Sequence, residues 1–198
     1  MFPLFETRQF AEGIPQHLEY HQRRLEYSSR IYFNKDVSFD KLSNIIKPQN
    51  ELNGIYKCKF EYNSESFKIS YAAYKPKTIQ NLKLVHEDSI NYSFKYSNRF
   101  HLNTLLEKIA EDEIIIIKNG FITDTSISNL CFFDGVKWVT PSTPLLKGTA
   151  RERLIEQKVI IEMEIREDDI FRFQKVMLIN AMLGFDEKKS LAISTIIV

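Results

Sequence analysis

Apolar and polar residues alternate along several short stretches of the chain, and a period of two is typical of half-buried β-strands. Residues 5–10 predict a first strand, and residues 56–62 and 67–74 predict the two strands of a hairpin. Residues 114–117 are four consecutive isoleucines that lead into a turn, which indicates a buried strand. The chain is therefore expected to be rich in short strands.

Apolar residues at helical spacing occur between these stretches, most clearly over residues 18–33 and again, more briefly, over residues 38–47. Helices are also predicted over residues 102–110 and 151–157. Further strands are predicted at 82–86, 92–94, 113–118, 121–123, 129–133, 137–140 and 176–183. Strands and helices in this mixed order predict an α+β fold rather than a regular βαβ succession.

A polar segment that carries Pro76 interrupts the pattern after the hairpin and offers the best boundary between two subdomains. We therefore expect one subdomain over residues 1–76, a linker at about 75–82, and a second subdomain over 83–198. A chain of 198 residues is long enough for two small cores.

Composition narrows the class of protein. The 27 Lys and Arg residues nearly balance the 26 Asp and Glu residues, so the chain lacks the basic field that attracts nucleic acid. The apolar runs are too short to span a bilayer, and the first residues do not read as a signal peptide. Cys58 and Cys131 lie far apart in sequence, as expected for buried thiols in a reducing compartment. We therefore expect a cytoplasmic protein that binds neither nucleic acid nor membranes.

Three groups with distinct chemistry follow one another along the second half of the chain. Lys95 begins a Lys-x-x-Asn-Arg pattern, Asp124 lies five residues before Asn129-Leu130, and Gly148 lies at the predicted start of a helix. Pyridoxal phosphate has an aldehyde, a basic ring nitrogen and a phosphate, which an amine, a carboxylate and a helix amino terminus can bind. The four histidines and the cysteines show no metal-ligand spacing, so no metal site is expected.

The order of these motifs resembles the class IV aminotransferase family, which includes branched-chain and D-amino-acid aminotransferases and aminodeoxychorismate lyases. The resemblance extends from Phe5 to about Gly184. It implies the D-amino-acid-aminotransferase-like fold, with a small amino-terminal α/β subdomain and a larger mixed-sheet pseudo-barrel subdomain. It also implies pyridoxal 5'-phosphate as cofactor and a homodimer.

The resemblance assigns Lys95 as the amine that forms the Schiff base with the cofactor. Such a lysine must be able to lose a proton, and a partly desolvated pocket near a cation lowers its pKa. Arg99, one helical turn beyond, would be that cation. Asn98 and Arg99 either contact the cofactor or anchor the following helix.

Asp124 stands where the family has a glutamate that binds the protonated ring nitrogen. Because aspartate is one methylene shorter, either the backbone lies closer to the ring, a water bridges the gap, or the ring is a weaker electron sink. An ordinary turn residue is the alternative, since Thr123-Asp124-Thr125-Ser126 is also good turn chemistry.

The resemblance places phosphate on the main-chain amides of Gly148, Thr149 and Ala150, although Thr149 would also suit a plain helix cap. Arg24 matches the arginine of the family's His-x-x-Arg-Leu pattern and would bind the same phosphate through its guanidinium fork. Asn180 and Ala181 match a late segment that completes the phosphate site.

The reaction is predicted from Phe5-Glu6-Thr7, which looks like the lyase branch, where the threonine lies over the active site. This favours 4-amino-4-deoxychorismate lyase, which eliminates pyruvate and yields 4-aminobenzoate for folate synthesis, with Lys95, Asp124 and Thr7 as catalytic residues. An amino-acid aminotransferase is the first alternative, and a degenerate, non-catalytic cofactor-binding protein is the second. In the two catalytic cases the substrate is a small molecule with amino and carboxylate groups.

Overall fold

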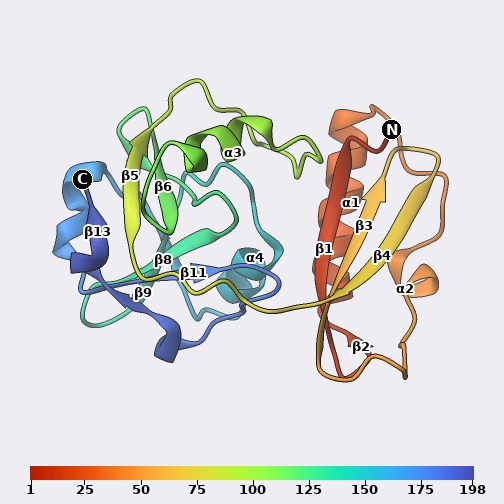
Figure 1. Cartoon of the computed structure of the whole chain (residues 1–198). Helices are drawn as coiled ribbons and strands as arrows, with labels where there is room; N and C mark the ends of the chain where they lie inside the picture. The colour runs from red at the N-terminus through yellow and green to blue at the C-terminus, as the bar shows by residue number, and fades with distance from the viewer. The chain divides into compact units, whose positions relative to one another are not determined.

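The amino-terminal sheet is built around the first predicted strand. A computed structural model describes residues 1–198, and its strands β1 (Leu4–Ala11), β2 (Ile14–Pro15), β3 (Ile55–Tyr62) and β4 (Phe67–Ala73) form an antiparallel sheet in the order β2-β1-β3-β4 (Figure 1). Helices α1 (Leu18–Tyr32) and α2 (Leu42–Ile45) bring Leu25 and Leu42 into one core with Leu4, Phe10, Phe60 and Tyr62. The alternating pattern of this region therefore predicted β1, β3 and β4.

Strand register decides which side chains share a face of this sheet. β1 pairs with β3 in a register that sets Phe5 opposite Glu61, Glu6 opposite Phe60 and Thr7 opposite Lys59. Successive residues of a strand point to opposite faces. Glu6 and Phe60 thus lie on the face that α1 covers, the α1 face, whereas Phe5, Thr7, Lys59 and Glu61 lie on the other, the Thr7 face.

The strand predicted just before Lys95 is wrong, because residues 92–94 are irregular. Tyr96 forms only an isolated antiparallel bridge with Leu4, and the Lys95 carbonyl accepts a hydrogen bond of 3.0 Å from the Phe5 N–H. The rings of Phe94 and Tyr96 lie 5.7 and 5.9 Å from the ring of Tyr32 on α1. The alternation of Phe94 and Tyr96 therefore reflects aromatic packing against α1 rather than a strand.

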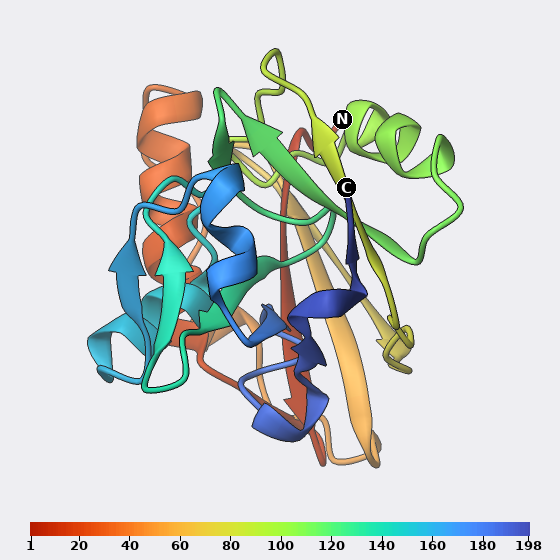
Figure 2. The same cartoon turned by 90° about the vertical axis from the view of Figure 1, so that its left-hand side faces the viewer.

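The rest of the chain forms two mixed sheets. One has the order β10-β9-β8-β11-β12 and the other the order β13-β5-β6-β7. Their bounds are β5 (Leu82–His86), β6 (Glu113–Lys118), β7 (Phe121–Ile122), β8 (Asn129–Phe133), β9 (Trp138–Pro141), β10 (Ile161–Met163), β11 (Lys175–Ile179), β12 (Leu191–Ala192) and β13 (Ile196–Ile197). β5 and β6 are parallel and are joined through α3 (Phe100–Glu107), which lies beside β6 (Figure 2).

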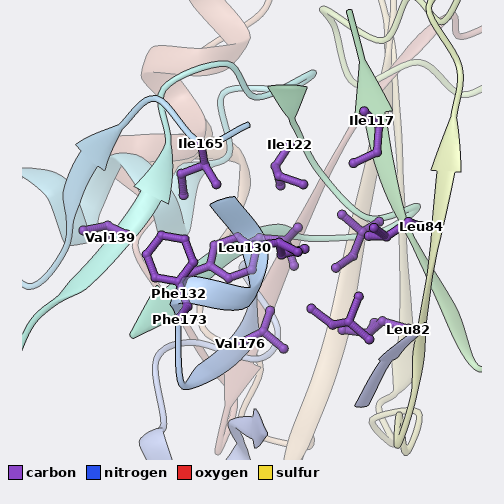
Figure 3. Packing of buried hydrophobic residues seen from close by; sticks show 13 residues of the cluster. Leu82, Leu84, Ile117, Ile122, Leu130, Phe132, Val139, Ile165, Phe173 and Val176 are labelled. Atoms are coloured by element: carbon purple, nitrogen blue, oxygen red, sulfur yellow. The ribbon is translucent and has the colours of Figure 1, made fainter. Parts of the chain in front are cut away.

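A core of aliphatic and aromatic side chains fills the space between these two sheets (Figure 3). β6 contributes Ile115 and Ile117 to this core, and its remaining isoleucines are also buried. A strand that is covered on both faces reads as an uninterrupted apolar run. Helix α4 (Thr149–Glu156) covers the outer side of the first sheet, where Leu154 packs with Cys131, Trp138 and Met177.

The predicted strand over 176–183 is too long, since β11 ends at Ile179. Asn180 ends it because its Oδ1 accepts hydrogen bonds from the Met182 and Leu183 N–H groups, at 2.8 and 2.9 Å, and so closes a turn. The 3₁₀ helices Glu167–Arg172, Glu187–Lys189 and Ile193–Thr195 were not predicted, and neither were the short strands β10, β12 and β13.

The chain packs as two units. The amino-terminal unit comprises Met1–Pro76 and Phe94–Asn98, and the carboxyl-terminal unit comprises Lys77–Ser93 and Arg99–Val198. Lys95 therefore belongs to the amino-terminal unit, although the residues on both sides of its segment belong to the other one. No helix is both long and apolar enough to cross a membrane.

Candidate functional site

Asp124 lies in the turn between β7 and β8 and is buried. Its Oδ1 accepts a hydrogen bond of 2.7 Å from the Asn129 side chain, and its Oδ2 accepts one of 2.9 Å from the Leu146 N–H. Burial raises the pKa of Asp124 to about 6, against the effect of these hydrogen bonds and of the Arg151 charge. Near pH 7 the group is therefore mostly a carboxylate.

Asn129 connects this acid to the glycine turn. Its Nδ2 also donates to the Leu146 carbonyl at 2.8 Å, and its Oδ1 lies 1.9 Å from where a Cβ on Gly148 would be. The φ angle of Gly148 is −74°, which any residue adopts, so glycine is required here by the close approach of Asn129. Asp124, Asn129 and the 146–148 turn thus form one assembly, which we call the acid–glycine assembly.

Helix α4 begins immediately after Gly148. The first amides of an α-helix have no partner within the helix, and no side chain caps this one. Thr149 is the first helical residue rather than the cap, and both Thr149 and Ala150 are buried. Main-chain donors at a helix amino terminus suit an anion such as phosphate, so this geometry fits the predicted cradle.

The loop that follows Asp124 is held from three sides. The buried carboxylate of Glu113 accepts hydrogen bonds from the N–H and the hydroxyl of Ser126, at 3.2 and 2.9 Å. Arg99 donates to the Ser126 carbonyl at 2.7 Å, and Asn180 donates to the Ser128 hydroxyl at 2.9 Å. Arg99 was expected either to contact the cofactor or to anchor the helix that follows it. The structure shows an anchoring contact, but to the loop that follows Asp124 rather than to that helix. A cofactor contact by Asn180 stays a prediction, as does one by Ala181 in the same turn.

Glu113 was not among the predicted site residues. The signal was present, because a glutamate directly before four isoleucines enters a buried strand and must find donors there. Which donors it would find depends on a loop 13 residues away.

A cavity of the carboxyl-terminal unit borders the acid–glycine assembly. Its volume is about 400 Å³, and its wall includes Tyr92, Lys118, Thr123 and Leu145. Thr123 and Leu145 are the chain neighbours of Asp124 and Leu146. The Lys118 ammonium donates to the Ile90 carbonyl at 2.6 Å, so it helps to shape the wall of this cavity.

In the amino-terminal unit, Lys95 and Thr7 lie on the same side of β1. The Lys95 Nζ is 4.8 Å from the centre of the Phe5 ring, which is on the Thr7 face. Thr7 is two residues further along the strand and points the same way. The structure therefore brings the predicted amine and the predicted threonine to one face.

Arg24 reaches the α1 face instead. Its Nε and Nη2 donate to the two carboxylate oxygens of Glu6 at 2.8 and 2.5 Å, and the Nδ1 of His21 lies 2.6 Å from the same carboxylate. Although burial alone would raise the pKa of Glu6, the Arg24 charge and these hydrogen bonds hold it well below its ordinary value. Burial lowers the pKa of His21 to about 4, so the neutral ring donates from Nδ1 near pH 7. Two N–H donors of Arg24 thus bind Glu6. A contact between Arg24 and the phosphate of the cofactor stays a prediction.

The predicted residues therefore form two groups. The amino-terminal unit contains Thr7, Arg24 and Lys95. The carboxyl-terminal unit contains the others, namely Arg99, Asp124, Gly148, Thr149, Ala150, Asn180 and Ala181. Within each unit, hydrogen bonds and strand register define how the members are arranged.

This fold and these motifs agree with the comparisons with known proteins. A sequence model of the family "Amino-transferase class IV" matches residues 3–186, and the chain therefore belongs to the class IV aminotransferase family. Members of this family are pyridoxal-phosphate-dependent enzymes.

Three proteins illustrate the range of similarity. An uncharacterised protein of Haemophilus influenzae is 44% identical over 187 residues, covering 93% of this chain and 100% of that protein. A crystal structure from Haemophilus somnus 129pt, named a "putative 4-amino-4-deoxychorismate lyase", is 37% identical with a TM-score of 0.86, over 93% of this chain and 98% of the other. A "putative amino-acid aminotransferase" of Mesorhizobium loti is 20% identical with a TM-score of 0.80 over the whole of both chains, and it supports the fold alone. The predicted α+β aminotransferase-like fold is thereby confirmed.

Proposed function

We propose that the protein binds pyridoxal 5'-phosphate and acts as a 4-amino-4-deoxychorismate lyase. The observation that carries the lyase assignment is that Thr7, which follows Phe5-Glu6, shares a face of β1 with Lys95. In the lyase branch that Phe5-Glu6-Thr7 resembles, the threonine lies over the active site. The Haemophilus somnus relative, similar over nearly its whole length, carries the same name and supports the same choice.

The residues present fit the cofactor. The helix amino terminus at Gly148 offers main-chain donors for a phosphate. An ionised carboxyl group accepts about four hydrogen bonds, so Asp124 has capacity for a ring N–H beside the donors from Asn129 and Leu146. When bound, the cofactor supplies a covalent link to the substrate nitrogen and an electron sink.

The chain's own residues then complete the elimination. The Lys95 amine would take a proton from the substrate ring carbon that bears nitrogen. The C–O bond to the enolpyruvyl group breaks, the group leaves as pyruvate, and the ring becomes aromatic 4-aminobenzoate, so no oxidant or reductant is consumed. Thr7 would pass a proton to the leaving group, and the Asp124 carboxylate would keep the ring nitrogen of the cofactor protonated.

Cofactor binding is tested by the visible absorbance band that a lysine-bound pyridoxal group gives. We expect the purified protein with added cofactor to show this band, and Lys95→Ala to lose it, because alanine has no amine to form the link. Lys108→Ala, which removes an exposed lysine, is the matched control and should keep the band. A protein that gives no band with added cofactor would contradict the proposal.

The reaction is tested by offering the reconstituted protein aminodeoxychorismate and, separately, amino acids with a keto acid. Equal amounts of pyruvate and 4-aminobenzoate support the lyase. Exchange of amino groups without pyruvate would instead establish an aminotransferase. Neither reaction from a protein that shows the band would indicate a non-catalytic cofactor-binding protein.

A further inference from the structure

The Thr7 face of the amino-terminal sheet is strongly cationic. Register places Lys57, Lys59 and Lys68 on it, since they pair with Gln9, Thr7 and Glu61, and Lys95 joins them beside Phe5. Among the paired residues of β1, β3 and β4 on this face, Glu61 is the acidic one. Both helices of the unit pack on the α1 face, so no helix of this unit neutralises that charge.

Lys59 differs from the other lysines of β3 and β4 in its surroundings. Its Nζ is 5.2 Å from the centre of the same Phe5 ring that Lys95 approaches at 4.8 Å, so the two nitrogen atoms are at most about 10 Å apart. Its side chain is 36% exposed and the residue is half-buried, whereas Lys57 and Lys68 are exposed. A half-buried ammonium interacts with an anion more strongly than a surface one, because water screens it less.

Lys59 is also held in place. Its Nζ donates to Glu61 Oε1 at 2.7 Å, and its strand position sets it directly opposite Thr7. An ammonium has three N–H donors, so one bond to Glu61 leaves capacity for a second anion. Glu61 thereby orients Lys59 and competes with that anion.

We propose that Lys59 binds a carboxylate of the substrate beside Lys95 and so selects carboxylate substrates. The inference rests on the proposed function, since it takes Lys95 as the reacting amine. It assigns to the Thr7 face a carboxylate subsite next to the amine, with Lys59 as its cation and Glu61 as the residue that positions it.

Calorimetry with a carboxylate that has no amine measures this subsite directly. Benzoate is the probe, and benzamide is its uncharged analogue. We expect Lys59→Gln in the reconstituted protein to raise the Kd of benzoate about 10-fold, as for loss of a hydrogen bond to a charged group. Lys68→Gln removes the same charge from the same face and should change the Kd less than about 2-fold, because that ammonium is exposed. Benzamide binding should not respond to either change.

Two further readouts separate this role from a structural one. Lys59→Gln should keep the visible cofactor band, and it should raise KM for the carboxylate substrate about 10-fold while kcat changes less than about threefold, as for lost uniform binding. Glu61→Gln should lower the Kd of benzoate, because the competing carboxylate is gone.

The outcomes distinguish this inference from the proposed function. Absence of the cofactor band in the unmodified protein would overturn the proposed function. A normal band with equal benzoate affinity in the unmodified protein and Lys59→Gln would overturn only the carboxylate subsite. Failure of benzoate to bind the unmodified protein that shows the band would overturn the subsite as well.

Discussion

Three buried carboxyl groups organise the residues of the candidate site, namely Glu6, Glu113 and Asp124. Each accepts at least two hydrogen bonds from groups five or more positions away in the chain, which is how a protein offsets the cost of burying a charge. A buried carboxylate can thus link two segments of the chain by hydrogen bonds and also serve as a chemical group of the site. Asp124 illustrates both roles, because the acid proposed to bind the ring nitrogen of the cofactor also accepts a hydrogen bond from the Leu146 amide in the glycine turn.

Gly148→Ala tests the close approach of Asn129. The added Cβ would lie 1.9 Å from Asn129 Oδ1, so we expect a loss of about 1–3 kcal/mol in the free energy of unfolding and weaker binding of the cofactor. Urea unfolding and titration with cofactor measure the two effects. The variant that also carries Asn129→Ala should be no less stable than Asn129→Ala alone, because the clash is relieved. Additive losses would contradict this explanation.

The pKa of Asp124 predicts a pH dependence of stability. Its pKa is raised from 3.8 to about 6, so the folded state binds more protons than the unfolded state between those values. The stability that Asp124 contributes is thus present below pH 4 and falls as pH rises toward 6. Asp124→Asn removes this change.

Urea unfolding of both proteins at several pH values measures the difference. The stability of the unmodified protein minus that of Asp124→Asn should fall by about 2 kcal/mol between pH 4 and pH 7, which is most of the effect of a shift of about two pKa units. His21 changes stability in the opposite direction, since its pKa is lowered to about 4, but it is common to both proteins and cancels. A difference that does not change with pH would contradict the raised pKa.

At the scale of elements, β1 separates two functions by strand alternation. Glu6 is directed to α1, where it binds Arg24, while Thr7 is directed to the face that carries Lys95. One face of β1 therefore binds the helix, and the other carries Thr7, which we propose to take part in the reaction beside Lys95. A shift of register by one residue would exchange the two sets.

Glu6→Ala should loosen α1 from this sheet. It leaves the Arg24 guanidinium buried without its carboxylate, and we expect a loss of about 3–5 kcal/mol in the free energy of unfolding. Glu61→Ala breaks a more exposed ion pair of the same sheet and should cost less than about 1 kcal/mol. Thermal and urea unfolding compare the two. Equal losses would show that burial of the Glu6 pair has no special effect.

At the scale of the whole molecule, the chain returns once to its first unit. Residues 94–98 carry Lys95 onto the edge of β1, while the chain on either side belongs to the carboxyl-terminal unit. This excursion explains why the alternation that continues from Phe94 to Tyr96 does not form a strand. Phe94 and Tyr96 pack against Tyr32 of α1, which lies about 60 residues earlier in the sequence.

Most strands and helices could be predicted from the sequence, but the residues at which they end could not always be predicted. The hairpin of β3 and β4, helix α1 and strand β6 follow from apolar periodicity, which is a local property of the chain. β11 ends early because of the Asn180 side chain, and β13 forms only because it pairs with β5 from the other end of its unit. Pairings between distant segments leave little trace in local composition.

The sequence by itself determined the family, the order of amine, acid and glycine turn, and the elements that carry them, because these depend on residue type and short spacing. Only the tertiary structure decided that Arg24 binds Glu6, that Asp124 binds the Leu146 amide and that Lys59 lies at the same ring as Lys95. Each of these contacts joins residues 18 or more positions apart. Such partners are chosen by strand register and helix packing, which are properties of the folded chain.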